Sequence, residues 1–138
     1  MSKKQILYPP VLLGQASFTN VASNGTQVAT LNFLNDTLLL PLAVIDVTWQ
    51  FSTAPTAGTT VGVHLQYSTD GVNYDSVVGG HSLVAQFAVT NSTSTFSRII
   101  GQGVPLMPFR FRVAASNNTD QTLTSLTVKI FGYSTGLC

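Results

Sequence analysis

Hydrophobic and polar residues alternate one by one along several short segments of the chain. Ile45, Val47, Trp49 and Phe51 share one face of such a segment, and polar residues occupy the other. Successive side chains of a β-strand point to opposite faces, so this alternation predicts a half-buried strand. The same period predicts five further strands, with these apolar positions: Ala29, Leu31 and Phe33; Val61, Val63, Leu65 and Tyr67; Leu83, Ala85, Phe87 and Val89; Phe109, Phe111 and Val113; Leu126, Val128 and Ile130.

Weaker alternation predicts three more strands, at residues 17–21, 74–78 and 96–100. Clusters of Gly, Pro, Asn and Asp separate the strand segments and are typical of turns. No segment shows a helical period of 3.6 residues with capping residues at its ends. Short strands at this spacing predict an all-β fold, a single antiparallel β-sandwich or jelly roll of about eight strands.

The amino-terminal segment is apolar, but Pro9 and Pro10 interrupt it. Proline has no backbone N–H to donate to a sheet, so this segment does not suit a central strand. We predict an extended arm at residues 1–13 that packs on its own domain or on a neighbour. The β-sandwich domain then spans residues 14–138, and a chain of 138 residues suits one such domain.

The last predicted strand raises a question about two aromatic residues. If Leu126, Val128 and Ile130 face the core, the alternation turns Phe131 and Tyr133 outward. Two aromatic side chains on an outer face indicate an interface. The alternative is a β-bulge near the glycine between them, which would turn both side chains inward.

Charged residues are few. Only 8% of the residues are charged, six basic and five acidic, against about 25% in an average soluble domain. A chain with so little charge can keep much of its surface against neighbouring subunits, which indicates an oligomer or lattice. The alternative is a monomer that its hydroxyl and amide side chains keep in solution. The basic residues are scattered along the sequence, so we expect no nucleic-acid partner. No apolar run predicts a signal peptide or a membrane helix, so we expect no membrane partner.

Candidate chemistry is sparse. No two carboxylates are marked out as an acid and base pair, and His64 and His81 are expected to be solvated. The single cysteine is the last residue, Cys138, so no disulfide framework exists. Oxygen-bearing side chains recur from Asp70 to Asp75 and could hold calcium, but Asp-Gly favours a tight hairpin. The sequence therefore predicts neither an enzyme nor a cofactor.

The stretch from Val63 to Tyr74, with Ser68-Thr69-Asp70-Gly71 at its turn, resembles a pattern common in small β-sandwich virion proteins of tailed bacteriophages. It is also similar to the strand-turn-strand of discoidin-like carbohydrate-binding jelly rolls. The composition and the apolar arm are similar in style to phage decoration (cement) proteins. This resemblance implies a structural protein that is a homotrimer or is bound in a lattice and that clamps the major capsid protein. It also implies that the protein is made in the host cytoplasm and lies on the outer surface of the virion.

Two sets of site residues follow from these interpretations. For the decoration protein, the expected interface residues are apolar or aromatic: Ile6, Leu7, Tyr8, Val11, Leu12, Phe131 and Tyr133. The alternative is a glycan-binding module of a phage head or tail, with its site at Tyr67, Asp70, Asn73 and Tyr74. Trp49 alternates with core residues, whereas carbohydrate-binding modules usually expose aromatic residues on loops.

Overall fold

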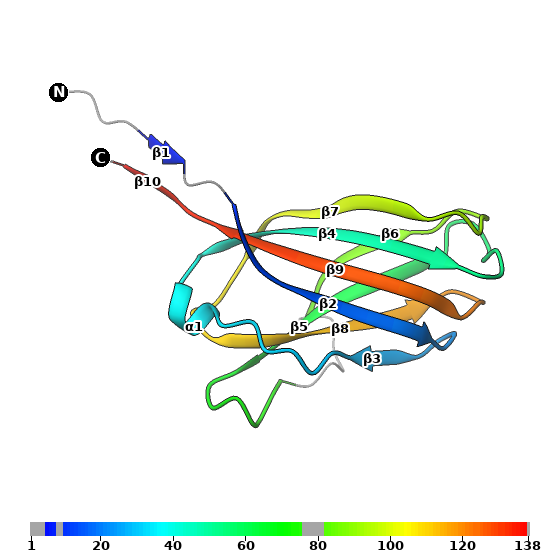
Figure 1. The fold of residues 1–138 in the computed structure, drawn as a ribbon, viewed down its shortest axis with the longest axis horizontal. Helices are drawn as coiled ribbons and strands as arrows, with labels where there is room; N and C mark the ends of the chain where they lie inside the picture. The colour runs from blue at the N-terminus through cyan, green and yellow to red at the C-terminus, as the bar shows by residue number, and fades with distance from the viewer. Residues whose placement is uncertain (1–4, 8–9, 76–81, 138) are drawn as a thin grey trace.

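The computed structural model describes residues 5–7, 10–75 and 82–137. Within these ranges the chain is almost entirely β-structure (Figure 1). The elements are β1 (Gln5–Leu7), β2 (Val11–Val21), β3 (Thr26–Val28), α1 (Asn35–Leu38), β4 (Leu42–Phe51), β5 (Thr60–Ser68), β6 (Leu83–Ala88), β7 (Phe96–Pro105), β8 (Arg110–Asn118), β9 (Leu123–Tyr133) and β10 (Thr135–Leu137).

Eight of the described strands form two antiparallel sheets of four. The first sheet has the order β2-β9-β4-β7 and the second has the order β3-β8-β5-β6. The chain crosses from one sheet to the other at every connection between these strands except the one from β5 to β6. This strand order is that of a jelly roll, so the predicted fold class is confirmed.

The alternating segments form strands because one face of each is apolar enough to be buried. In β4, Ile45, Val47, Trp49 and Phe51 are all at most 5% exposed, and they face the second sheet across the core. The predicted strands at residues 17–21, 61–67, 96–100 and 126–130 likewise lie within β2, β5, β7 and β9. Those around Leu83 and Phe111 lie mostly within β6 and β8.

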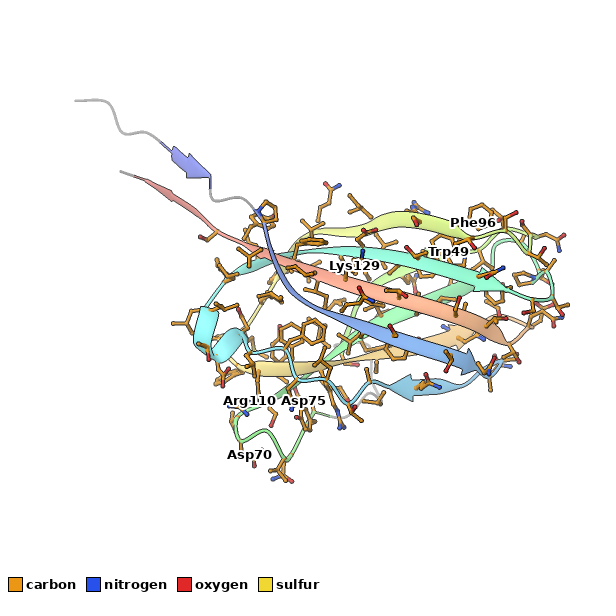
Figure 2. All side chains as sticks on the ribbon, in the orientation of Figure 1. Trp49, Asp70, Asp75, Phe96, Arg110 and Lys129 are labelled. Atoms are coloured by element: carbon orange, nitrogen blue, oxygen red, sulfur yellow. The ribbon has the colours of Figure 1, made fainter. Side chains whose placement is uncertain are left out.

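Aromatic side chains fill both ends of the core. Phe33 and Phe111 stack with their ring centroids 5.0 Å apart. Toward the other end, Trp49 packs on Phe87 at 4.3 Å and on Phe96 at 5.6 Å (Figure 2). Offset aromatic pairs of this kind stabilise a core beyond the area that they bury.

The prediction of a strand through Ala29, Leu31 and Phe33 is wrong. The strand β3 ends at Val28, and only a single bridge, from Phe33 to Phe111, follows it. Val28 pairs with Ala114 and Phe33 pairs with Phe111, so the chain advances five residues from Val28 to Phe33 while β8 advances only three. The extra residues bow outward, which leaves Leu31 exposed instead of buried.

Two other expectations need correction. The four-residue helix α1 was not expected, because one helical turn is too short to produce a period in the sequence. At residues 74–78, Tyr74 and Asp75 are not in a strand, and the remaining three residues lie outside the described ranges. The only helix in the described part of the chain is α1, and it is far too short to cross a membrane.

Candidate interface at the arm end of the sandwich

The two ends of the chain pair with each other and project from the sandwich. The strand β1 runs antiparallel to β10, with Ile6 opposite Gly136 and Leu7 opposite Thr135. Figure 1 shows this two-stranded ribbon extending away from the sheets, and we call the end of the sandwich that it leaves the arm end. Tyr8 lies outside the described residues.

The projecting part is shorter than residues 1–13. Residues 11–13 lie in β2, where Val11 pairs with Gly132 and Leu12 with Phe131 of β9. The strand β2 is an edge strand of the first sheet, which suits a segment that follows two prolines. Val11 and Leu12 are still about half exposed, at 49% and 50%.

The two aromatic residues of β9 lie on the outer face of the first sheet. Ile130 is fully buried, whereas Phe131 and Tyr133 are partly exposed. The pairing of β9 with β4 runs through Gly132 without a shift, so no bulge in β9 turns these side chains inward. The irregularity is in β2 instead, between Leu12 and Gly14.

The loop that contains α1 adds leucines to the same end of the molecule. Leu34, Leu38 and Leu39 are 48–60% exposed. Alternation does not mark these residues, although a run of three leucines just before Pro41, outside any alternating segment, is a signal for part of this group. Met107 and Phe109, in the connection between β7 and β8, are also exposed.

A fully buried amide holds these loops together. Asn35 donates from Nδ2 to the backbone oxygens of Leu40 at 3.0 Å and Met107 at 2.8 Å. Its Oδ1 accepts the backbone N–H of Leu40 at 2.9 Å. Two of these bonds close the loop around α1, and the third joins that loop to the connection between β7 and β8, so Asn35 fixes where the exposed leucines and Met107 are presented.

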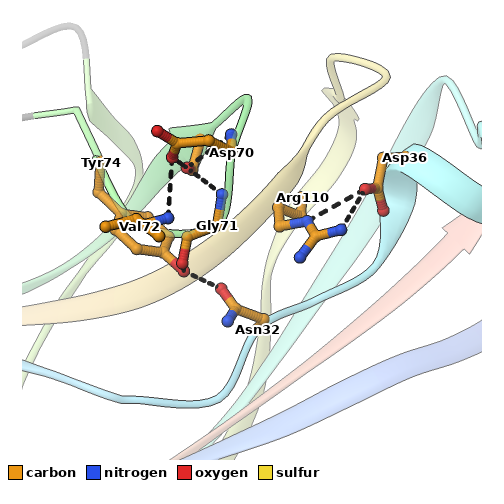
Figure 3. A network of polar contacts seen from close by, with 8 residues as sticks. Asn32, Asp36, Asp70, Gly71, Val72, Tyr74 and Arg110 are labelled. Carbon is orange, nitrogen blue, oxygen red and sulfur yellow. Dashed lines mark hydrogen bonds and ion pairs between the residues drawn. The ribbon is translucent and has the colours of Figure 1, made fainter.

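An ion pair fixes the same loop to the second sheet. Arg110 of β8 donates from Nε at 3.1 Å and from Nη2 at 3.0 Å to Oδ2 of Asp36 in α1 (Figure 3). Both donors contact one oxygen, and both side chains are about one-third exposed. The contribution of this pair to stability is therefore small, and its role is to orient α1.

Large apolar side chains thus gather at the arm end. We define the arm-end surface by the exposed residues there: Val11, Leu12, Leu34, Leu38, Leu39, Met107 and Phe109. These residues make up most of the large hydrophobic side chains that are exposed in the described part of the chain. A cluster of this kind is typical of an interaction surface.

The candidate glycan residues fall into two groups. The Asp70 carboxylate accepts hydrogen bonds at 2.8 Å from the backbone N–H groups of Val72 and Asn73 and from the Asn73 side chain, and one at 3.0 Å from Ser68 (Figure 3). These bonds, those of Asn73 first, hold the pKa of Asp70 well below its usual range. Asp70 is therefore occupied in stabilising its own turn.

Tyr74 is also occupied. Its hydroxyl donates to Asn32 Oδ1 and lies 3.1 Å from the backbone oxygen of Gly71, and the Arg112 guanidinium lies 4.0 Å from the centre of its ring. Tyr67 and Asn73 both line a pocket of about 200 Å³. The structure brings these two candidates together in a pocket that neither Asp70 nor Tyr74 lines.

The expectation that His64 is solvated is wrong. His64 is only 9% exposed, with Nδ1 3.1 Å from Ser82 Oγ and Nε2 2.9 Å from Ser116 Oγ. The strand β5 lies between β6 and β8, and even its polar side chains are covered. Burial lowers the pKa of His64. His81 lies outside the described residues, and among those described no group of three or more His, Cys, Asp and Glu could hold a metal ion.

No model of a known protein family matches the sequence, and no curated protein matches it. Among solved structures, the chain is similar to a protein in the capsid structure of Helicobacter pylori bacteriophage KHP30, at 13% identity, 98% coverage of both chains and a TM-score of 0.44. It is also similar to a protein of the Triatoma virus empty capsid, at 13% identity, 94% and 89% coverage and a TM-score of 0.39. The family 22 carbohydrate-binding module of Clostridium thermocellum Xyn10B has 13% identity, 79% and 62% coverage and a TM-score of 0.36. Identities and TM-scores this low do not indicate a shared function.

Proposed function

We propose that this protein is a structural subunit of a virion, in particular a decoration protein that binds the major capsid protein as a homotrimer and stabilises the head. The observation that carries this proposal is the arm-end surface, a group of exposed large apolar side chains at the end from which the terminal ribbon projects. Jelly rolls include viral capsid and lectin domains, and a fold alone does not define a function, so the proposal is supported by the arm-end surface and not by the fold.

The ribbon suits assembly because, in the part of the chain that the structure describes, its strands pair only with each other. The strands β1 and β10 form a separate two-stranded sheet, so each has a free edge with unpaired backbone groups. A free edge is a template for pairing with a strand of another chain. In a shell or a trimer, the neighbouring subunit provides that strand.

The leucines give a scale for the interaction. Covering a side chain that is half exposed contributes on the order of 1 kcal/mol, since complete burial of a leucine contributes about 1.5–3 kcal/mol. The arm-end surface therefore provides several kcal/mol per subunit. When one trimer makes three such contacts at once, avidity strengthens its attachment further.

The test combines sizing with particle binding. We expect the full chain to be trimeric by light scattering and to attach to undecorated phage heads. Leu38→Ser together with Leu39→Ser is expected to weaken both properties. Val72→Ser changes an even more exposed apolar residue, which lies outside the arm-end surface, and is the control. Unchanged assembly and attachment of the double variant would contradict the proposal.

A deletion tests the ribbon separately. Removing residues 1–9 deletes β1 and leaves β2 complete, whereas removing residues 1–13 also deletes the start of β2. The shorter deletion is expected to leave the domain folded and to weaken attachment to particles. If the shortened protein decorates heads at unchanged occupancy, the ribbon has no role in attachment.

The pocket at Tyr67 and Asn73 is the observation that favours the glycan-binding alternative. Binding on a glycan array that is lost in Asn73→Ala would support a carbohydrate-binding module. Equal signals for all glycans on the array, without any preference, would contradict the glycan-binding alternative.

A further inference from the structure

The pocket at Tyr67 has the chemistry of a site for a cationic side chain. Its lining combines the aromatic residues Tyr67 and Phe109, the Met107 side chain and the acidic residue Asp75. The Tyr67 hydroxyl accepts the backbone N–H of Met107 at 3.2 Å, which fixes one wall. An ammonium group beside a carboxylate and over an aromatic ring is stabilised by both.

The Asp75 carboxylate lies close enough to Tyr67 to influence its hydroxyl. Burial, before all other causes, raises the pKa of Tyr67, and the negative charge of Asp75 raises it as well, while the hydrogen bond from Met107 lowers it. The backbone of Asp75 is held at both polar groups. Its backbone N–H donates to the backbone oxygen of Tyr67 at 3.0 Å, and its backbone oxygen accepts a hydrogen bond from Gln66 Nε2 at 2.5 Å.

No basic side chain in the described ranges forms an ion pair with Asp75. The one ion pair there joins Arg110 to Asp36. The neighbouring Arg112 donates from Nε to Gln66 Oε1 at 2.8 Å and stacks on Tyr74. Figure 2 shows Asp75 near the lower edge of the molecule, on the same side as Asp70 and Arg110. Its charge is therefore available to a cation from outside the domain.

A larger apolar cavity adjoins this pocket. It has a volume of about 500 Å³ and shares Tyr67 and Met107 with the smaller pocket. Its other lining residues come from β6 and from the end of β7, and they are mostly apolar: Leu83, Val84, Gln102, Gly103, Val104 and Pro105. Since the two cavities share Tyr67 and Met107, they lie next to each other, and we call the pair the groove: the smaller part is acidic and aromatic, and the larger part is mostly apolar.

We propose that this groove receives the amino-terminal segment of a second copy of the chain, with Lys3 or Lys4 at Asp75 and the apolar residues that follow in the larger cavity. The sequence Lys3-Lys4-Gln5-Ile6-Leu7 matches the groove, since its cationic part precedes its apolar part. The inference rests on the proposed function and specifies a contact between subunits. The projecting ribbon carries Gln5, Ile6 and Leu7 away from the two sheets of their own domain.

Charge reversal tests the contact in the full chain. Asp75→Asn is expected to weaken self-association about fivefold in sedimentation equilibrium, as for the loss of one ion pair with an aromatic neighbour. Charge reversal on either side, by Asp75→Lys or by Lys3→Asp together with Lys4→Asp, is expected to weaken self-association at least about tenfold. Like charges then meet in the groove. Combining the three changes is expected to restore association to within about threefold of the original protein. Asp46→Asn, on the outer face of the first sheet, is the control for loss of a carboxylate and should change nothing.

Three outcomes would overturn the inference. Unchanged association of the Asp75 variants, while Leu38→Ser with Leu39→Ser still weakens it, would overturn this contact and leave the proposed function standing. Weaker attachment to phage heads with unchanged self-association would show that the groove binds the capsid protein and not a second copy. A monomer at every concentration that also fails to attach to heads would overturn both proposals. Circular dichroism of each variant shows that the fold is retained.

Discussion

The buried side chain of Asn35 offers the sharpest test of how the arm end is built. Asn35→Ala removes three hydrogen bonds and leaves the N–H and oxygen of Leu40 and the oxygen of Met107 without their partner. Each buried group left unsatisfied costs about 1–3 kcal/mol, and the loops can relax enough to admit water at some of them. We expect a loss of about 4 kcal/mol in the free energy of unfolding.

The assay is urea unfolding monitored by circular dichroism, at a protein concentration at which the original protein and its variants have the same oligomeric state. For a domain of this size, the expected loss corresponds to a fall in Tm of roughly 12 °C. Asn91→Ala is the matched control, because Asn91 is exposed and donates one bond, to the oxygen of Pro55 at 2.9 Å. We expect that control to lose less than about 1 kcal/mol. Equal losses in the two variants would refute the structural role of Asn35.

Three further predictions concern a close contact and two pKa shifts. Gly132→Val is expected to destabilise the fold by about 1–3 kcal/mol in urea unfolding, because a Cβ there would lie 2.6 Å from Cδ1 of Leu40. An unchanged unfolding midpoint would contradict this tight packing. Burial lowers the pKa of His64 in the folded state, so its contribution to stability is complete above about pH 6.5 and is lost as the pH falls through the folded pKa. His64→Gln should therefore flatten the fall in Tm between pH 7 and pH 5, and an equally steep fall would count against a buried imidazole. The pKa of Asp70 is also lowered, so its contribution is present above about pH 4 and disappears in more acidic solution. Asp70→Ala should lower Tm at pH 7 and lower it less in strongly acidic solution, and a loss that is the same in both solutions would be inconsistent with a charged acceptor.

The strands were predictable from the sequence wherever one face of the strand is buried and the other face is exposed. The face of β4 that carries Ile45, Val47 and Trp49 is buried, and the alternation in the sequence records this directly. The strand order within the sheets was not predictable, because it depends on pairing between distant segments. Residues 15 and 129 are neighbours, for example, and nothing local in either strand indicates it.

The errors came from context that periodicity does not contain. His64 occupies a polar position of an alternating strand, yet it is buried because β5 has neighbours on both sides and its polar face is covered. Leu31 matches the strand period, yet it is exposed because its segment bows away from β8. In both cases the neighbouring strands, and not the period of the sequence, decided the burial.

The candidate interface was predictable only in part. The alternation in β9 indicated that Phe131 would face outward, and the structure places it beside Leu12. The leucines around α1 were missed because a buried Asn35, and not any periodic pattern, holds that loop in place. Pairing of the chain ends in a ribbon was also not predictable, since β1 and β10 are three residues each.

The most direct test of the account is amide hydrogen exchange of the full chain, free at low concentration and bound to phage heads. The account predicts that binding slows exchange at the arm-end surface and in β1, while exchange in the core strand β4 stays the same. If the arm end exchanges equally fast in both states while other surfaces become protected, neighbours do not cover this end and the central claim is wrong.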